Sequence, residues 1–339
     1  MGGNALKQTT TRRYEADEYH RLADLVIAAL RKAAPGVRFE VVRAVGDKTS
    51  FGDMDVLTDL AADRSMKELV AQTFGDREMV QNGTVLSFPV AELQVDLLRH
   101  PGDEFDTARI YFAWNDAGNL QGRIAHRMGF KYGFKGLHYC LRDGTHLIEE
   151  IEVSRDMREV FAFLGFDQAG SDFARFDQGF ESLAAMFDFV ASSRYFDPSA
   201  FPLEHRSHKA RTRDRKRPTY MAFLRYVAER FGPQGEPTRD DARALERALV
   251  AFPVFAARLS AAQERLKRQR AVKARFNGAL VASLTGLSGQ ALGRFMASFT
   301  STFASREAFH EWVLATDADG IADRVRLQQG VQAANASCS

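Results

Sequence analysis

The sequence has few cysteines, no long hydrophobic run and almost no net charge. Its 339 residues include two cysteines, Cys140 and Cys338, which are too few for a disulfide framework or a zinc site. No apolar stretch approaches the roughly 20 residues of a membrane-spanning helix, and residues 1–11 lack the apolar core of a signal peptide. We therefore expect a cytoplasmic protein with reduced thiols and no membrane partner.

Positive and negative side chains balance overall but are unevenly distributed. Lys and Arg number 46 and Asp and Glu 44, for a net charge of +2, which by itself argues against a nucleic-acid partner. Residues 1–170 contain 21 basic and 26 acidic side chains, whereas residues 205–275 contain 19 and 7. This distribution suits an acidic metal site followed by a polyanion-binding surface, although solvated helix faces explain it equally well.

Hydrophobic patterns separate a mixed front half from a helical back half. Strands are expected at 39–45, 54–58, 84–89 and 93–98. Helices are expected beside them at 15–34, 63–73, 118–128 and 155–164. From about residue 172 the strand pattern fades, and amphipathic stretches predict helices at 172–191, 218–231, 238–251, 254–276, 288–300 and 305–314. The chain is therefore predicted to be α+β, with an all-helical C-terminal part.

Three aspartates form the most informative pattern. Asp53 and Asp55 lie two residues apart at the start of a predicted strand, so their side chains project from one face. Asp96 lies inside the apolar segment Leu93–Leu98, where a carboxylate is costly to bury unless it is paired or bound to a metal. If the two strands are neighbours, the carboxylates converge on hard cations, two Mg²⁺ or alternatively Mn²⁺. A lone Asp-x-Asp is more often a solvated loop, but the combination favours two-metal phosphoryl or nucleotidyl transfer.

The segment Thr49–Leu57, which contains the first two aspartates, resembles the palm motif of the DNA polymerase β (family X) branch of the nucleotidyltransferase superfamily. Val95–Leu98 resembles the strand with that family's third metal-binding aspartate, and Val160–Gly165 resembles the end of its thumb. The resemblance covers roughly residues 37–168. It implies a palm of mixed β-sheet and helices in which the three aspartates are catalytic metal ligands, the third also acting as base or proton relay.

Other matches to this family concern the nucleotide. Tyr111 and Phe112 resemble the aromatic pair that packs against the sugar, which implies a deoxynucleotide. Asn119 and Arg123 resemble the residues at the minor groove of the new base pair, which implies a templated reaction. The family's phosphate-binding Gly-Ser pair has no counterpart at the corresponding place. We therefore assign its role to a shortened loop with the following nucleotide-binding residues: Gly46, Lys48, Ser50 and Gly52.

Basic residues of the back half gather in two segments. Residues 206–217 carry seven Lys or Arg in twelve positions, and residues 265–275 carry six more. Such density binds phosphates through Coulomb attraction and counterion release. The predicted nucleic-acid-binding residues are Arg206, Lys209, Arg211, Arg213, Arg215, Lys216, Arg217, Lys267, Arg268 and Arg270.

These patterns predict three domains: an N-terminal helical segment (1–36), a palm- and thumb-like catalytic domain (37–170) and a helical basic nucleic-acid-binding domain (171–339). Arg12 and Arg13 in the first segment either touch the substrate or belong to a disordered tail, which is the commoner outcome. The predicted activity is that of a DNA polymerase β-like nucleotidyltransferase in a bacterium or a phage-infected cell. It would add nucleotides from a nucleoside triphosphate to a nucleic-acid 3′ end, DNA rather than RNA.

Three alternatives stay open. Residues 276–293 are weakly similar to the C-terminal helical segment of bacterial CCA-adding enzymes and poly(A) polymerases, which keeps an RNA or tRNA 3′-end nucleotidyltransferase open. A small-molecule or protein nucleotidyltransferase would use the same carboxylates without binding nucleic acid. A non-catalytic binding module is disfavoured because all three carboxylates are present.

Overall fold

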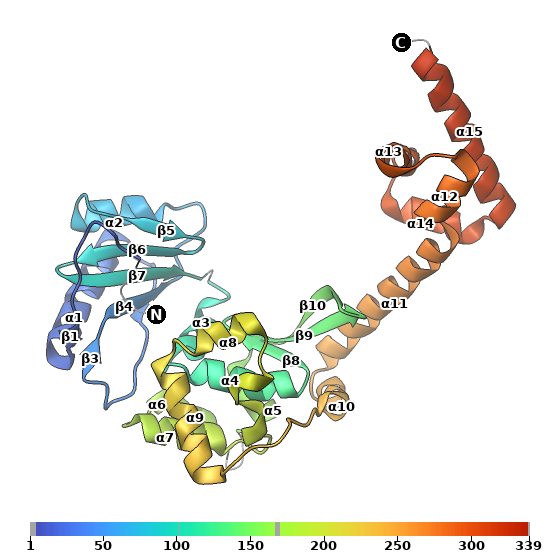
Figure 1. The fold of residues 1–339 in the computed structure, drawn as a ribbon. Helices are drawn as coiled ribbons and strands as arrows, with labels where there is room; N and C mark the ends of the chain where they lie inside the picture. Colours follow the sequence, from blue (N-terminus) through green and yellow to red (C-terminus); the bar gives the residue numbers. More distant parts are fainter. Residues whose placement is uncertain (1–4, 101, 167–169, 338–339) are drawn as a thin grey trace. The chain divides into compact units, whose positions relative to one another are not determined.

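The computed structural model describes residues 5–100, 102–166 and 170–337, and Cys338 lies outside them (Figure 1). It is a mixed α+β structure with a sheet-and-helix N-terminal region and a helical C-terminal part, as the sequence patterns predicted. The chain forms two compact units, Met1–Ala256 and Ala257–Ser339. The predicted boundary between residues 170 and 171 therefore lies inside the first unit. No described helix is both long and apolar enough to cross a bilayer.

A five-stranded sheet forms the centre of the N-terminal region. Its strands, in spatial order, are β2 (Phe39–Val41), β4 (Asp53–Thr58), β7 (Leu93–Arg99), β6 (Val85–Val90) and β5 (Val80–Asn82). β4 and β7 are parallel and the other neighbours antiparallel. The strands predicted at 54–58, 84–89 and 93–98 are thus confirmed, whereas the one predicted at 39–45 ends at Val41.

Two helices cover one face of this sheet, α1 (Ala16–Ala33) and α2 (Met66–Phe74) (Figure 1). Their apolar residues form one buried cluster with Met54, Val56, Val95 and Leu97 of the central strands. Because side chains alternate along a strand, burial of these four residues turns the odd-numbered residues of β4 and the even-numbered residues of β7 to the other face. Packing of the core thereby decides where the predicted metal ligands lie.

The chain continues from this sheet into a second, three-stranded antiparallel sheet and its helices. The elements are α3 (Phe105–Phe112), α4 (Ala117–Arg127), β8 (Phe130–Gly133), β9 (Gly136–Asp143), β10 (His146–Ser154) and α5 (Met157–Phe163). Helices were predicted near α4 and α5, but the three strands were not. The first five residues of β10 are mostly exposed, so the chain there lacks the regular apolar alternation of a half-buried strand.

From residue 172 onward every described element is helical. The first unit ends with α6 (Asp172–Gln178), α7 (Leu183–Ala191), the 3₁₀ turns η1 (Pro198–Ala200) and η2 (Leu203–His205), α8 (His208–Asp214), α9 (Pro218–Phe231) and α10 (Asp241–Ala251). The helix predicted over 172–191 is broken at Gly179, whose φ of 107° is in the region that favours glycine. A Cβ there would lie 2.5 Å from the Trp114 ring.

Helix α11 (Pro253–Arg275) begins at the end of the first unit and continues into the second. The other helices of the second unit are α12 (Gly278–Thr285), α13 (Gly289–Thr300), α14 (Arg306–Ala315) and α15 (Ala318–Ser337). Its core contains the buried aromatic residues Phe276, Phe295, Phe299 and Phe309. The many phenylalanines of the back half therefore serve packing.

Candidate metal and nucleotide site

The three predicted metal ligands converge. Strands β4 and β7 pair in parallel with Asp55 directly opposite Asp96, and Asp53 lies two residues earlier on the same face of β4. One carboxylate oxygen from each residue lies within 4.8 Å of those of the other two. The expectation that the two strands are neighbours is therefore confirmed, and the group can hold a metal ion. Oxygen ligands of this kind suit hard divalent cations.

Electrostatic repulsion within the group favours such a cation. Burial raises the pKa of Asp55 to about 7, with further contributions from Asp53 and Asp96 that Lys48 only partly opposes. Burial also raises the pKa of Asp96, although hydrogen bonds from neighbouring side chains oppose the shift. A divalent cation would offset this cost by neutralising the clustered negative charge.

Gln94 fixes the orientation of the third carboxylate. Its Nε2 donates to both oxygens of Asp96, at 2.9 and 3.0 Å. Its Oε1 accepts the backbone N–H of Ala5 at 3.0 Å, and the side chain is only 2% exposed. Sequence reasoning missed Gln94. The available signal was a second polar residue, two positions before Asp96, on the same face of an apolar strand.

A cavity of about 500 Å³ opens beside Asp53 and Asp55. Three carboxylates line it, Asp53, Asp55 and Asp116, together with cationic, aromatic and amide side chains: Arg13, Arg43, Lys48 and Arg217, then Tyr19, Phe51, Tyr111 and Phe112, then Asn115 and Asn119. This volume and mixed lining are typical of a small-molecule site. Of the cationic residues in this cavity, Arg43 is new relative to the sequence analysis, which had placed Lys48 with the nucleotide and Arg217 with nucleic acid.

The predicted nucleotide-binding residues fall into two groups. Lys48, Tyr111, Phe112 and Asn119 line the cavity, as expected for residues that contact a nucleotide. Gly46 does not line it, and its backbone N–H donates to the carbonyl of Phe180 at 2.9 Å. That N–H is therefore already used inside the protein.

Ser50 and Gly52 lie next to the cavity and contact Arg13. The Ser50 hydroxyl oxygen accepts a hydrogen bond from Arg13 Nε at 2.9 Å. A Cβ on Gly52 would lie 2.9 Å from Arg13 Nη1, so glycine leaves room for the guanidinium group. The side chain that reaches these two residues thus comes from the N-terminal segment. A disordered tail was expected there as the commoner outcome, but Arg13 is held by hydrogen bonds to Ser50.

Arg123 connects two elements of the protein. Its Nε donates to the carbonyl of Ala200 at 3.1 Å, and its Nη2 donates to the same oxygen. Burial lowers the pKa of Arg123, and the charge of Arg206 lowers it further. The guanidinium therefore ties α4 to η1, and it is not among the residues that line the cavity.

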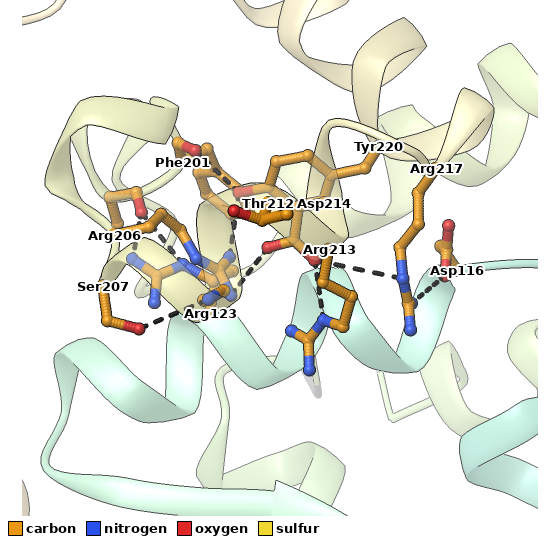
Figure 2. Close-up of polar contacts among 12 residues, drawn as sticks. Asp116, Arg123, Phe201, Arg206, Ser207, Thr212, Arg213, Asp214, Arg217 and Tyr220 are labelled. Carbon is orange, nitrogen blue, oxygen red and sulfur yellow. Dashed lines mark hydrogen bonds and ion pairs between the residues drawn. The ribbon is translucent and has the colours of Figure 1, made fainter.

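Asp214 at the end of α8 organises several of the predicted nucleic-acid-binding arginines (Figure 2). Its side chain is fully buried, and it forms ion pairs with Arg206 at 2.9 Å and Arg213 at 3.0 Å. Arg217 lies 3.9 Å from Asp214 and pairs with Asp116 at the start of α4. Buried carboxylates are stable only when compensated in this way, so these three arginines have a structural role.

The other predicted nucleic-acid-binding residues are more accessible. Lys209, Arg215 and Lys216 are exposed around α8, and Arg211 is half-buried. Lys267, Arg268 and Arg270 are exposed on α11 in the second unit. Arg268 has Glu311 at 3.4 Å, which offsets part of its charge.

No protein-family model and no curated protein matches this sequence. A functional assignment therefore depends on the residues of the site. The carboxylate group can hold a metal ion, and the cavity beside it accepts a ligand of small-molecule size. Arg43 and Arg217 pair with Asp177 and Asp116, so Arg13 and Lys48 are the lining cations that can attract an anion.

Proposed function

We propose that this protein is a metal-dependent nucleotidyltransferase of the DNA polymerase β-like type, with the five-stranded sheet as its palm. The observation that carries the proposal is the pairing of Asp55 with Asp96 on parallel neighbouring strands, which brings three carboxylates together beside a cavity. The cationic and aromatic lining of that cavity complements a nucleoside triphosphate, which presents phosphates, a sugar and a base.

Each residue of the site has a definite task in this proposal. Asp53 and Asp55 would hold two Mg²⁺ ions, and Asp96 would add a ligand to one of them and would accept the proton of the attacking 3′-hydroxyl. When bound, the ions lower the pKa of that hydroxyl and neutralise the triphosphate and the pyrophosphate leaving group. Gln94 keeps the Asp96 carboxylate in place. Tyr111 and Phe112 pack against the sugar.

Primer extension with Mg²⁺ tests the proposal directly. The protein is offered dNTPs or NTPs with DNA or RNA primers, and we expect nucleotide incorporation that EDTA abolishes. Asp53→Asn should reduce turnover by about 10³-fold, since metal stabilisation of the transition state is worth several kcal/mol. Asp63→Asn, at an exposed aspartate, is the matched control. Absence of Mg²⁺-dependent turnover on any nucleotide, or full activity of Asp53→Asn, would exclude the proposal.

A second candidate, untemplated addition to a 3′ end, is favoured by the position of Arg123. The resemblance assigns this residue to the new base pair, but its guanidinium group is committed to the Ala200 carbonyl. A single-stranded primer and a primer–template duplex separate the two modes. Equal extension of both, with no dependence on the templating base, supports the second candidate, as does incorporation of NTPs onto RNA with no use of dNTPs.

A small-molecule or protein acceptor is the remaining alternative. It predicts Mg²⁺-dependent use of a nucleotide without any binding of nucleic acid. A mobility-shift titration at low salt distinguishes it, because the proposed enzyme should retard both DNA and RNA under these conditions.

A further inference from the structure

Residues 5–15 form a strap that lies along the five-stranded sheet. The carboxylate of Glu78 accepts the backbone N–H groups of Lys7 at 2.7 Å, Gln8 at 3.1 Å and Thr9 at 2.8 Å. One acidic side chain therefore holds three consecutive residues of the strap. A second attachment is the hydrogen bond from the Ala5 N–H to Gln94.

The far end of the strap is held near the start of β4. The Arg12 N–H donates to the carbonyl of Glu92 at 2.8 Å, and the Arg12 side chain pairs with the carboxylates of Glu92 and Glu18. Strand β1 (Tyr14–Glu15) then pairs with β3 (Ser50–Phe51), Tyr14 opposite Phe51. Arg13 is thereby fixed between two anchored neighbours.

Arg13 lies at the cavity, whereas Arg12 forms ion pairs with Glu18 and Glu92. Arg13 Nε and Nη2 donate to the hydroxyl and carbonyl oxygens of Ser50, both at 2.9 Å. Arg13 lines the cavity with Asp53, and no ion pair joins it to an acidic residue in the described part of the chain. A guanidinium group carries five N–H donors, so two bonds to Ser50 leave the Nη1 donors for a ligand.

We propose that Arg13 binds the phosphate groups of the nucleotide substrate and that the strap holds it in place for this purpose. The inference rests on the proposed function and takes it further, by naming the residue that replaces the phosphate-binding loop expected at Gly46 and Ser50. Lys48, which lines the same cavity, adds a second positive charge. Guanidinium groups pair with phosphate oxygens through two parallel hydrogen bonds, so Arg13 supplies geometry as well as charge.

Titration calorimetry with dATP and with inorganic tripolyphosphate, in Mg²⁺, tests this proposal. Arg13→Ala should weaken binding of both ligands by about 10- to 100-fold, the range for charged hydrogen bonds, and Arg13→Lys should recover part of the loss. Arg64→Ala, at an exposed arginine outside the cavity, should bind like the wild type. Unchanged dissociation constants in a folded Arg13→Ala protein would overturn the proposal.

A second variant separates placement of Arg13 from folding. Glu78→Ala removes the acceptor that holds the strap but leaves every cavity residue intact, so it should weaken dATP binding less than Arg13→Ala does. In the Arg13→Ala background it should have no further effect, because the two changes act through one guanidinium group. Additive losses in the double variant would contradict the role of the strap.

Failure of this inference is distinguishable from failure of the proposed function. If Arg13→Ala extends primers with an unchanged KM for the nucleotide, the protein is still a nucleotidyltransferase, but Arg13 does not bind its substrate. Conversely, phosphate binding that depends on Arg13, without transfer to any acceptor, would keep the binding site and exclude the transferase.

Discussion

Asp55 carries the largest electrostatic cost in the candidate site. Burial and the charges of Asp53 and Asp96 raise its pKa from 3.8 to about 7 in the metal-free protein. Because the folded state binds the proton more tightly than the unfolded state, this residue favours folding below about pH 4. This contribution to stability is lost as the pH rises towards 7, because Asp55 then becomes charged in a buried position close to Asp53 and Asp96.

Removing this charge should therefore stabilise the protein while abolishing its activity. We expect Asp55→Asn to raise the stability of the first unit in EDTA at pH 8 by about 4 kcal/mol, since the pKa is raised from 3.8 to about 7 and one pKa unit corresponds to about 1.4 kcal/mol. The gain should disappear at pH 4. Thermal unfolding at the two pH values measures it, with Asp63→Asn as control. An unchanged midpoint at pH 8 would mean that burial and the neighbouring carboxylates do not disfavour the charged form of Asp55.

Gln94 should act on the metal site through Asp96, and its replacement also removes the acceptor of the Ala5 N–H. Gln94→Met keeps the volume of the side chain but removes the two hydrogen bonds to the carboxylate. We expect Mg²⁺ affinity to fall by about 10- to 100-fold, the usual effect of losing a partner that orients a metal ligand. Calorimetric Mg²⁺ titration measures this, and Gln72→Met, at an exposed glutamine, is the control. Equal affinities of the two variants would remove Gln94 from the site.

At the scale of elements, local pattern predicted the parts of the fold that alternate strictly. The segments around Asp55 and Asp96 have one apolar and one functional face, so both strands were predicted from sequence. The convergence of the aspartates depended on these strands being neighbours, which they are in the structure. The strands β8 to β10 were missed: β8 has only four residues, and exposed residues interrupt the alternation in the first half of β10. The break between α6 and α7 was missed although Gly179, the residue after α6, has a positive φ and marks it.

The phosphate-binding residues were harder to predict because their hydrogen bonds join segments that are distant in the sequence. Gly46 looked suitable because glycine and serine in a loop offer backbone and hydroxyl donors. Its N–H instead donates to the carbonyl of Phe180, in the connection between α6 and α7 far along the chain. The sequence left open whether Arg13 touches the substrate or belongs to a disordered tail, because its contacts with Ser50 join segments that are distant in the sequence.

The contact between Gly179 and Trp114 gives a test at this scale. Gly179→Ala places a methyl group against the indole ring in a left-handed backbone conformation, so we expect a loss of about 2 to 4 kcal/mol in stability. Gly232→Ala has a similar positive φ but open space around the Cβ, and should cost about 1 kcal/mol. Urea unfolding compares the two. Equal losses would show that backbone strain alone decides the effect.

For the whole molecule, net charge is a poor guide to binding because part of the charge is internal. The excess of basic residues between 205 and 275, 19 against 7, suggested a polyanion-binding surface. Arg206 and Arg213, however, compensate the buried Asp214, and Arg217 pairs with Asp116. Of these three arginines, Arg217 joins the start of α9 to the start of α4 and lines the cavity, whereas Arg206 and Arg213 stabilise the end of α8.

The exposed cations of the same segment should therefore carry the contact with nucleic acid. Replacing Lys209, Arg215 and Lys216 by Ala removes three phosphate-binding groups, so the slope of log K against log salt should fall by about 2 to 3 and the affinity by on the order of 10- to 100-fold. The matched control replaces Arg21, Lys32 and Lys67 by Ala. These exposed residues lie on α1 and α2, which cover the face of the five-stranded sheet opposite to the three aspartates. Mobility-shift titrations from low to moderate salt compare the two triple variants. Equal salt slopes would place the nucleic-acid contact outside α8 and leave the exposed residues of α11 as the surface to test next.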